Sequence, residues 1–412
     1  MKAICIPCSG PVEVEGLLPL LDHPLFQRLR SCRQLGLNDL VFPGARHSRL
    51  EHALGVLKRA RFAARRQALV GDELRNLELF ALLHDVGHGP FSHQVEPVLT
   101  GDHHLRGEKT ILALAEPIRQ CGGDPERILQ MLRGKDPLGE WVSDRNLGAD
   151  KLDYLERDAL HIGFAGTPAL ETIQENTVRT ADGYLALREK FIEEGKRVQK
   201  FYSYLHQHGY LNKTALSAQR MLQWALQKEL SLRTPEEADA IWEMTDDTLL
   251  EWLRKGHSDA ARKMLRRLET RDLLRTCLCL KPQGYGYVEN VEGKAIALQE
   301  WPRQALMTLS RNLESLDTVM KTEDALAEAV HARAGEVLLA AMPYFRKLLP
   351  KDLRIANGSN DYWLLEKDRD HKNSLESDYL RTFAVRVITT PRLREKLAKN
   401  PEALLQTLAR LQ

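Results

Sequence analysis

Apolar residues recur at steps of three and four along most of this chain, and that spacing predicts amphipathic helices. Helical patterns run through about residue 130. Further helical patterns cover four later ranges, 184–207, 214–232, 246–254 and 258–278. The hydrophobic pattern therefore predicts a mainly α protein.

Strand-like alternation, in which every second residue is apolar, is confined to short stretches. They are 12–15, 285–296 and 383–388. The second stretch contains Glu292-Gly293, a turn sequence, and so predicts a hairpin. The charged stretch 366–378 is expected to be a solvated loop. We therefore expect a few short strands, mostly in the C-terminal region.

The pair His84-Asp85 ends an apolar helical run, and His88 and His93 follow closely. Neutral imidazole and carboxylate groups hold divalent metals. Neighbouring residues on a helix diverge by about 100°, so both can face one ion only near a helix end. Gly87 supplies such an end, because glycine commonly stops a helix. The segment therefore predicts a metal site.

A second polar pattern follows Gly148. An apolar stripe at helical spacing consists of Leu152, Leu155, Ala159 and Ile162. On another face, the same steps give Asp150, Tyr154, Asp158 and His161. Such a polar stripe is costly to bury without partners, which is typical of the wall of a site. Periodicity alone leaves Asp153, one turn from Asp150, as a rival metal ligand.

Several segments together resemble the HD-domain phosphohydrolases, and within them the branch of deoxynucleoside triphosphate triphosphohydrolases. The resemblance is strong over residues 1–165, in the segments 23–30, 33–36, 41–55, 82–93 and 148–158. It implies an all-helical HD-domain core at residues 1–168 that binds the metal and carries catalysis. Residues 169–412 are then a mainly helical accessory region that completes the substrate pocket and makes oligomer contacts.

The resemblance also implies site roles. One divalent ion (Mn, Mg, Fe, Ni and Zn all suit such ligands) is held by His52, His84, Asp85 and Asp150. Asp153 then supports the site from outside it. The histidines expected to contact phosphate oxygens or move protons are His88, His93 and His104. A second metal held by these histidines is the alternative reading.

Two departures from the family pattern leave points open. The family opening often reads Asp-Pro-x-His-Gly, whereas this chain has Ile6-Pro7-Cys8-Ser9-Gly10, so substrate identity is open. The later family histidine usually precedes a glutamate, but here His103 and His104 are both candidates. Spacing to the pair Ile111-Leu112 favours His104.

The substrate contacts implied by the resemblance are Gln34, Arg49, Lys151, Tyr154 and Asp158. Arg49 stands three residues before His52, so the two can share a helix face. Guanidinium and ammonium groups neutralise phosphoryl charge. The alternative for Arg49 and Lys151 is a surface ion pair, and for Asp158 a role in bracing its helix.

The composition limits which partners and locations are expected for this protein. The 412 residues carry a formal net charge of only +2, which gives no global electrostatic case for nucleic acid. The basic runs at 58–66 and 262–267 are expected to be solvated helix faces, so nucleic-acid binding is the weaker reading. No apolar stretch reaches the ~18–20 residues needed to span a bilayer, and we expect a cytoplasmic protein without a membrane partner.

The cysteines predict no metal site of their own. They include a C-x-x-C and a C-x-C pair, formed by Cys5, Cys8, Cys277 and Cys279. These thiols could hold zinc only if the fold brought them together, and we expect them to be reduced.

The resemblance implies a metal-dependent phosphohydrolase that converts deoxynucleoside triphosphates to deoxynucleoside and triphosphate and assembles as a homo-oligomer. One alternative keeps the chemistry but acts on another nucleotide, such as a monophosphate, cyclic or modified one. A second is a non-catalytic nucleotide or nucleic-acid sensor.

Overall fold

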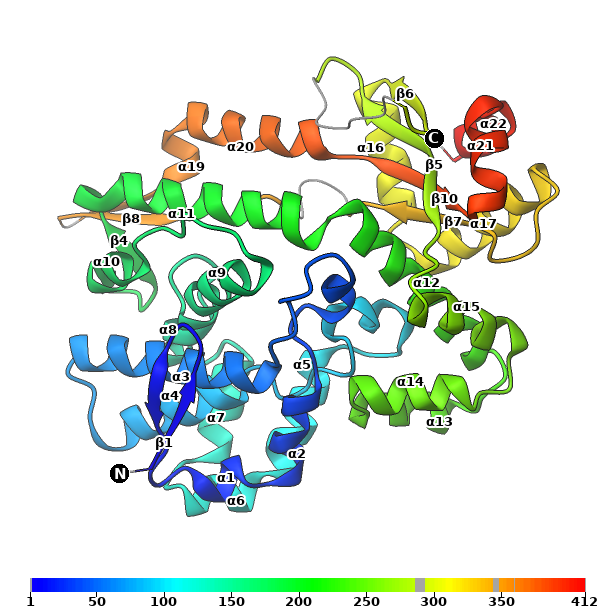
Figure 1. The fold of residues 1–412 in the computed structure, drawn as a ribbon. Coiled ribbons are helices and arrows are strands. Elements are labelled where there is room, and N and C mark those ends of the chain that lie inside the picture. Colours follow the sequence, from blue (N-terminus) through cyan, green and yellow to red (C-terminus); the bar gives the residue numbers. More distant parts are fainter. Residues whose placement is uncertain (1, 286–292, 344–347, 359, 412) are drawn as a thin grey trace. The chain divides into compact units, whose positions relative to one another are not determined.

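The computed structural model describes residues 2–285, 293–343, 348–358 and 360–411 (Figure 1). By its internal contacts the chain divides into two compact units. The first comprises Met1–Leu205, Glu236–Leu249 and Pro350–His371. The second comprises His206–Pro235, Leu250–Leu349 and Lys372–Gln412.

The first unit contains most of the helices that precede residue 205. They are α1 (Leu18–Leu21), α2 (Pro24–Gln27), α3 (Arg49–Arg66), α4 (Gly71–Leu83), α5 (His103–Ala113), α6 (Ala115–Gln120), α7 (Pro125–Leu132), α8 (Glu140–Ser143), α9 (Ala149–Ile162), α10 (Leu170–Glu175), α11 (Ile192–Tyr204) and, from the later segment, α19 (Leu364–Lys367). Its strands are β1 (Ala3–Ile6), β2 (Gly10–Glu13), β3 (Thr177–Arg179), β4 (Leu185–Arg188), β8 (Arg354–Asn357) and β9 (Asn360–Trp363).

The second unit combines helices with one sheet. Its elements are α12 (Lys213–Leu230), α15 (Asp259–Glu269), α16 (Arg303–Asn312), α17 (Leu316–Ala329), α21 (Pro391–Lys399), α22 (Glu402–Ala409), β5 (Arg275–Pro282), β6 (Ala297–Trp301), β7 (Val337–Ala341) and β10 (Val385–Thr389). Three helices contain residues of both units, namely α13 (Pro235–Asp239), α14 (Asp246–Arg254) and α20 (Arg369–Thr382).

Two long helices, α3 and α4, form the centre of the first unit and pack against each other, with α9 on α3 (Figure 1). Ser48 caps α3: its hydroxyl accepts from the Glu51 backbone N–H, and the Glu51 carboxylate accepts from the Ser48 N–H. Such a capping box satisfies backbone groups that a helix start leaves unpaired. The predicted apolar stripe of α9 is buried, at Leu152, Leu155, Ala159 and Ile162. Because this stripe is packed in the interior, the position of α9 is fixed, and Asp150 on its polar stripe faces His52 of α3.

Three small sheets complete the described fold. β1 and β2 form an antiparallel pair. In the order β3-β4-β8-β9, only the central β4–β8 pair is parallel. In the order β6-β5-β10-β7, the β5–β6 pair is parallel and the other pairs are antiparallel.

The mainly α prediction is confirmed, and several elements match closely. The expected helices 214–232 and 246–254 are α12 and α14, and the expected strand 383–388 is β10. The expected strand 12–15 lies two residues earlier, as β2. The predicted hairpin at 285–296 overlaps residues 286–292, which lie outside the described residues.

Other expectations were wrong. The range 184–207 begins with strand β4, and its helix starts only at Ile192. The range 258–278 is helical only to Glu269 and continues into β5. β5 is buried from its second residue onward, and a short apolar run of that kind cannot be told from a buried helix by periodicity.

The charged stretch 366–378 is not a loop but falls in α19 and α20. The reason is an apolar face that continues beyond the charged residues. Leu375, Tyr379 and Phe383 lie at four-residue spacing and are all buried. A helix with one narrow buried face tolerates many charges on its other faces.

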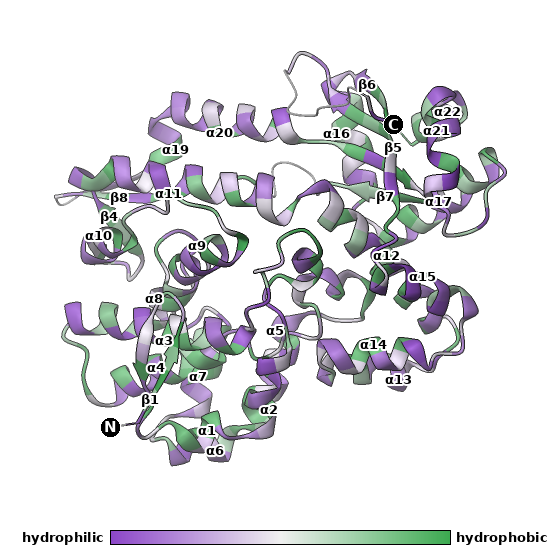
Figure 2. Ribbon diagram, viewed as in Figure 1, coloured by the Kyte–Doolittle hydropathy of each residue, from purple (hydrophilic) through white to green (hydrophobic). Residues whose placement is uncertain are grey.

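The helices carry hydrophilic residues along their lengths (Figure 2). Among the described residues, no helix combines the length and the apolar composition needed to cross a membrane.

Candidate functional site

The His84-Asp85 pair lies where α4 ends, as the sequence predicts. Helix α4 ends at Leu83, and His84 is its C-cap residue. The Nδ1 atom of His84 shares a hydrogen bond of 2.9 Å with the Ala81 carbonyl oxygen, which directs Nε2 away from the helix. That Nε2 atom is buried and has no hydrogen-bond partner among the described residues.

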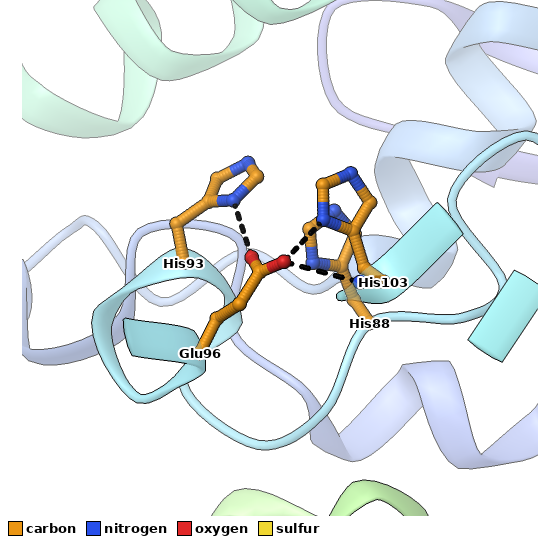
Figure 3. A group of neighbouring side chains, drawn as sticks. All are labelled: His88, His93, Glu96 and His103. Atoms are coloured by element: carbon orange, nitrogen blue, oxygen red, sulfur yellow. Dashed lines mark hydrogen bonds and ion pairs between the residues drawn. The ribbon is translucent and has the colours of Figure 1, made fainter. Parts of the chain in front are cut away.

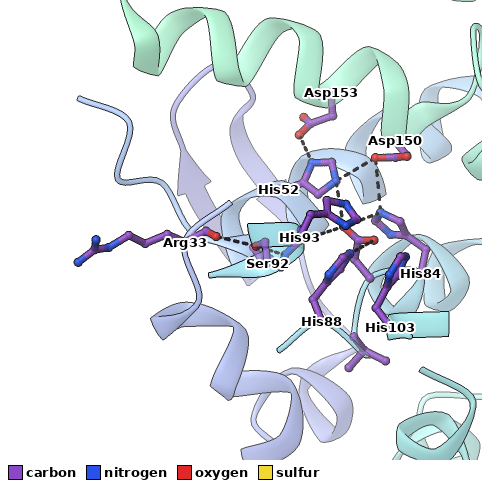
Figure 4. A network of polar contacts seen from close by, with 12 residues as sticks. Arg33, His52, His84, His88, Ser92, His93, His103, Asp150 and Asp153 are labelled. Carbon is purple, nitrogen blue, oxygen red and sulfur yellow. Dashed lines mark hydrogen bonds and ion pairs between the residues drawn. The ribbon is translucent and has the colours of Figure 1, made fainter. Parts of the chain in front are cut away.

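Polar side chains from α3, from α9 and from the segment just after α4 converge here, and Figure 4 labels three of them, His52, His84 and Asp150. His52 Nε2 on α3 lies 3.1 Å from Asp150 Oδ1 on α9 and 3.7 Å from Asp85 Oδ2. His84 Nε2 lies 3.6 Å from the same Asp85 oxygen and 3.7 Å from the same Asp150 oxygen. One ligand atom each of His52, His84 and Asp85 lies within 4.8 Å of the others. Together with Asp150, which adjoins both imidazoles, we call these residues the HD cluster; their two imidazoles and two carboxylates could hold a divalent ion.

Asp153 contacts His52 from the other side of its ring. Its Oδ2 atom lies 2.9 Å from His52 Nδ1. The same carboxylate accepts two hydrogen bonds of 2.9 Å from Arg157, one from Nε and one from Nη2. A carboxylate on the second nitrogen of a ligating histidine fixes the ring orientation and its tautomer. The geometry therefore favours Asp150 over Asp153 as the ligand.

The charged groups of the HD cluster shift one another's pKa values. Burial raises the pKa of the Asp85 carboxyl, but His84 and Arg49 hold it well below its usual range. Burial likewise raises the pKa of Asp150, but the hydrogen bond to His52 and the nearby His84 imidazole lower it further than burial raises it. Both carboxylates are therefore ionised at neutral pH and able to bind a cation.

Arg49 is buried beside the HD cluster and is not a surface residue. Its guanidinium forms an ion pair with Asp85 through Nη1 and donates from Nε to Ser92 Oγ at 2.7 Å. The Arg49 residue is 2% exposed. The alternative of a surface ion pair is therefore wrong, and Arg49 places a fixed positive charge beside a ligand carboxylate.

The segment that holds Ser92 has an unusual backbone. Phe91 and Ser92 both have φ near +55°, at 55° and 53°, which L-residues rarely adopt. The buried Asp246 carboxylate accepts a 2.7 Å hydrogen bond from the Phe91 N–H and a 3.1 Å bond from the Arg33 N–H. Such backbone conformations persist only where the surroundings fix them.

Lys151 is buried and lies over an aromatic ring that the sequence reading did not single out. Its Nζ atom is 3.2 Å from the centroid of the Tyr202 ring and 5.2 Å from that of Tyr154. Burial lowers the pKa of the Lys151 ammonium well below its usual range, although Asp150 and Asp144 oppose that shift. Lys151 is thus no surface ion pair either. Tyr202 lies on α11, far away in sequence, and no local motif marks it.

The predicted contacts Gln34 and Asp158 lie on either side of His47. Asp158 Oδ1 shares a buried 2.8 Å hydrogen bond with His47 Nε2. The Gln34 N–H donates to the His47 carbonyl oxygen at 3.0 Å. The Oε1 atom of Gln34 is buried without a hydrogen-bond partner among the described residues. The Gln34 side chain therefore has an acceptor oxygen that a substrate could use. Asp158, by contrast, already holds the His47 ring by a hydrogen bond.

Two of the remaining predicted histidines, His88 and His93, gather with His103 beside the HD cluster (Figure 4), and Figure 3 shows them with Glu96. One ligand atom of each residue in this group lies within 4.8 Å of the others, and we call the group the histidine cluster: His88, His93, Glu96 and His103. His104 is not part of it. The His104 ring is 4.1 Å from that of His103, and the residue is exposed. Sequence reading missed Glu96, although its position three residues after His93 was a usable signal.

Gly87 allows the His84-Asp85 turn to pack against α5. A Cβ atom at residue 87 would lie 2.1 Å from the His103 carbonyl oxygen and 2.2 Å from the Gly107 nitrogen. We expect Gly87→Ala to lower the free energy of unfolding by about 3 kcal/mol, because the obstructing atoms are backbone. Chemical denaturation would measure the change.

Gly107→Ala is the matched control, because its Cβ would meet only the Leu132 side chain at 3.4 Å and the Gly87 nitrogen at 3.9 Å. A loss from Gly87→Ala no larger than that from Gly107→Ala would contradict this account of the turn.

Comparison with known proteins identifies the segment that carries the HD cluster. Residues 49–158 match the family model described as HD domain. An uncharacterized protein of Methanocaldococcus jannaschii is 27% identical over 357 residues, which cover 83% of this chain and 75% of the relative. Human deoxynucleoside triphosphate triphosphohydrolase SAMHD1 is 26% identical over 404 residues, which cover 81% of this chain. The chain spans only 63% of the length of the human protein.

Solved structures share the fold. A phosphohydrolase from Bacteroides thetaiotaomicron superposes with a TM-score of 0.70 at 19% identity, over 95% of this chain and 100% of that one. A hypothetical protein from Aquifex aeolicus superposes with a TM-score of 0.69 at 21% identity, over 97% and 99% of the two chains.

Proposed function

Because residues 49–158 of this chain are an HD domain, we propose that the protein is a metal-dependent phosphohydrolase that converts deoxynucleoside triphosphates to deoxynucleoside and triphosphate. The convergence of His52, His84, Asp85 and Asp150 carries the proposal. The substrate class is supported by the similarity to triphosphohydrolases over most of the chain.

The residues of the HD cluster fit a divalent ion. Two imidazoles and two ionised carboxylates form a donor set that suits Mn, Mg, Fe, Ni or Zn. The Nε2 atom of His84 is buried and has no hydrogen-bond partner among the described residues, so in its neutral form its lone pair could bind the ion. A bound ion would supply Lewis-acid polarisation of a phosphate oxygen and would acidify a water molecule.

The protein's own groups would then stabilise charge and move protons. Arg49, already fixed beside Asp85, neutralises negative charge on the α-phosphate. Lys151 on α9, with Tyr154 and Tyr202 around it, would become a second cation when a phosphate binds beside it, because a nearby anion opposes the lowering of its pKa by burial. The free Oε1 atom of Gln34 accepts a hydrogen bond from a sugar hydroxyl.

Hydrolysis in this scheme breaks the bond between the α-phosphorus and the 5′-oxygen. Water attacks the phosphorus and loses a proton, triphosphate departs whole, and the 5′-oxygen takes a proton from an imidazole. The candidates for these transfers are His88, His93 and His104, with His103 as the better-placed member of the adjacent pair because it joins the histidine cluster. In the wider proposal, residues 1–168 perform this chemistry, and residues 169–412 complete the pocket and form a homo-oligomer.

A hydrolysis panel tests the proposal. Purified, metal-supplemented protein is given the four deoxynucleoside triphosphates singly and mixed, and products are separated by chromatography. Deoxynucleoside with intact triphosphate is the expected result. Cleavage confined to monophosphates or cyclic nucleotides would instead favour the second candidate, which the altered opening Ile6-Pro7-Cys8-Ser9-Gly10 supports. Metal and nucleotide binding without any cleavage would favour a sensor.

Metal binding to the HD cluster is expected to release protons. Burial lowers the pKa of the His52 imidazole, but hydrogen bonds to Asp150 and Asp153 raise it to about 10 in the metal-free protein. His52 is therefore protonated at pH 7.5 and must lose its proton to bind a metal. We expect about one proton released from His52 per ion, and tighter binding as the pH rises from 6 to 9. Calorimetry in buffers of different ionisation enthalpy measures the number, and a buffer-independent heat would contradict the expectation.

A further inference from the structure

Residues 239–246, which we call the anchor segment, are linked to the chain that follows the end of α4. The anchor segment belongs to the first unit but lies far from α4 in the sequence. The Arg28 guanidinium joins the two parts of the chain. Its Nη1 donates to the Met244 carbonyl oxygen at 3.1 Å, and its Nη2 donates to the carbonyl oxygens of Val86 and His88 at 3.2 and 2.6 Å. The backbone that leads away from α4 is therefore held by a distant segment.

Asp246, the last residue of the anchor segment, holds the strained turn at Phe91 and Ser92. Asp246 is 1% exposed, and its carboxylate accepts from the Phe91 N–H at 2.7 Å and from the Arg33 N–H at 3.1 Å. Both residues of the turn have positive φ angles, which cost free energy for side chains other than glycine. The turn therefore depends on bonds such as these to keep its conformation.

The same turn carries the hydroxyl group that orients Arg49. Ser92 Oγ accepts from Arg49 Nε at 2.7 Å and donates to the Arg33 carbonyl oxygen at 2.7 Å, a contact that Figure 4 shows. The other end of the guanidinium forms the ion pair with Asp85. A charge that is already in place stabilises a transition state without reorganising during the reaction. The position of the Arg49 guanidinium therefore depends on the Ser92 turn.

We propose that Asp246 is a positioning residue for the proposed reaction, because it fixes the turn at Phe91 and Ser92 and thereby the Arg49 guanidinium. Asp246 acts through these residues and not on the substrate. This inference rests on the proposed function, since it requires Arg49 to bind a phosphate group.

A carboxylate suits this place because two backbone donors face it. Its two oxygens accept from the N–H groups of Phe91 and Arg33, and the Arg33 Nε lies 3.7 Å from Oδ2. Asparagine has one acceptor oxygen, so its amide nitrogen would face the second N–H. Burial raises the pKa of Asp246 to about 6, although the two backbone N–H groups oppose the shift, and the group is therefore ionised at pH 8. Asp246→Asn thus removes the charge and one acceptor while keeping the size of the side chain.

A double-mutant cycle distinguishes positioning from a purely structural role. Hydrolysis is measured at pH 8 with metal-supplemented wild type, Asp246→Asn, Arg49→Lys and the double variant. We expect Asp246→Asn to lower kcat/KM by about 30-fold, because a misplaced guanidinium loses much of its effect on the transition state. In the Arg49→Lys background the same substitution should cost less than about 3-fold, because lysine lacks the forked group that joins Ser92 to Asp85. Equal factors in the two backgrounds overturn the inference.

Asp247→Asn is the matched control, because Asp247 is an exposed neighbour in the same first turn of α14 and loses the same charge. It should leave kcat/KM unchanged. Ser92→Ala keeps Asp246 and removes only the hydroxyl group next to Arg49, so it should lower kcat/KM by a factor similar to that of Asp246→Asn. Circular dichroism verifies that each variant is folded. Wild-type kcat/KM in Asp246→Asn or in Ser92→Ala overturns the inference.

Binding of inorganic triphosphate keeps the inference separate from the proposed function. Calorimetry with the metal-supplemented proteins needs no turnover, so it remains informative if no deoxynucleoside triphosphate is cleaved and the proposed function fails. We expect Asp246→Asn to weaken triphosphate binding by about 10-fold in the wild-type background and to have little effect in Arg49→Lys. No triphosphate binding by the wild type, or the same loss in both backgrounds, overturns the inference.

Discussion

Asp85→Asn is expected to lower kcat by about 1,000-fold or more while the protein stays folded. Asp85 lies 3.6–3.7 Å from His84 and His52, and its charge is paired with Arg49. Asparagine keeps the shape but removes the anionic donor that an ion needs. A catalytic metal contributes several kcal/mol to transition-state stabilisation, and each 1.4 kcal/mol is about a factor of ten in rate.

The variant separates catalysis from folding. Arg49 keeps the hydrogen bond to Ser92 and can still donate to the amide oxygen that replaces the carboxylate, so the loss of stability is expected to be smaller than if the side chain were removed. Asp102→Asn is the matched control, because Asp102 caps α5 near the site and asparagine caps helices about as well as aspartate. Product formation and bound metal are measured for both. Wild-type turnover in Asp85→Asn would exclude the HD cluster as the catalytic centre.

The residues of the HD cluster could be proposed from the sequence because their signals are local. His84 and Asp85 are adjacent, and Gly87 marks the end of their helix. Asp150 begins a helix whose apolar stripe already indicated which face is buried. Periodicity could not choose between Asp150 and Asp153. The structure distinguishes them, because Asp153 contacts Nδ1 of the His52 ring and Asp150 contacts Nε2.

Contacts between segments far apart in the chain could not be predicted from the sequence. Tyr202 reaches Lys151 from α11, and Asp246 holds the Phe91 N–H although 155 residues separate them. The boundary expected at residue 168 separates a catalytic core from an accessory region by their roles, and it stays a prediction. By contacts, the first unit extends to Leu205 and includes two later segments. Strand β5 was misread for a related reason, since burial on both faces removes the alternation that reveals a strand.

Asp153→Ala is expected to lower the free energy of unfolding of the metal-free protein by about 3–5 kcal/mol. The Asp153 carboxylate bridges His52 and Arg157, and the Arg157 side chain is 0% exposed. Its removal leaves a buried guanidinium without its counter-ion, and breaking a buried pair in this way is costly. Among the described residues, the hydrogen-bond partners that remain to Arg157 are neutral, namely the Pro7 carbonyl oxygen and Ser9 Oγ.

The pH dependence of that loss identifies its cause. Burial raises the pKa of Asp153, but His52 and Arg157 bring it down to about 2, below the ordinary value of an aspartate carboxyl. A carboxyl with a lowered pKa contributes stability above the unfolded pKa and loses it as the pH falls towards the folded value. The difference between wild type and Asp153→Ala should therefore be full at pH 6–7 and shrink between pH 4 and pH 2. Asp150→Ala, which removes a carboxylate that is 36% exposed, should cost much less in the metal-free protein. Equal losses in the two variants, or a loss independent of pH, would mean that the pair with Arg157 does not hold this helix in place.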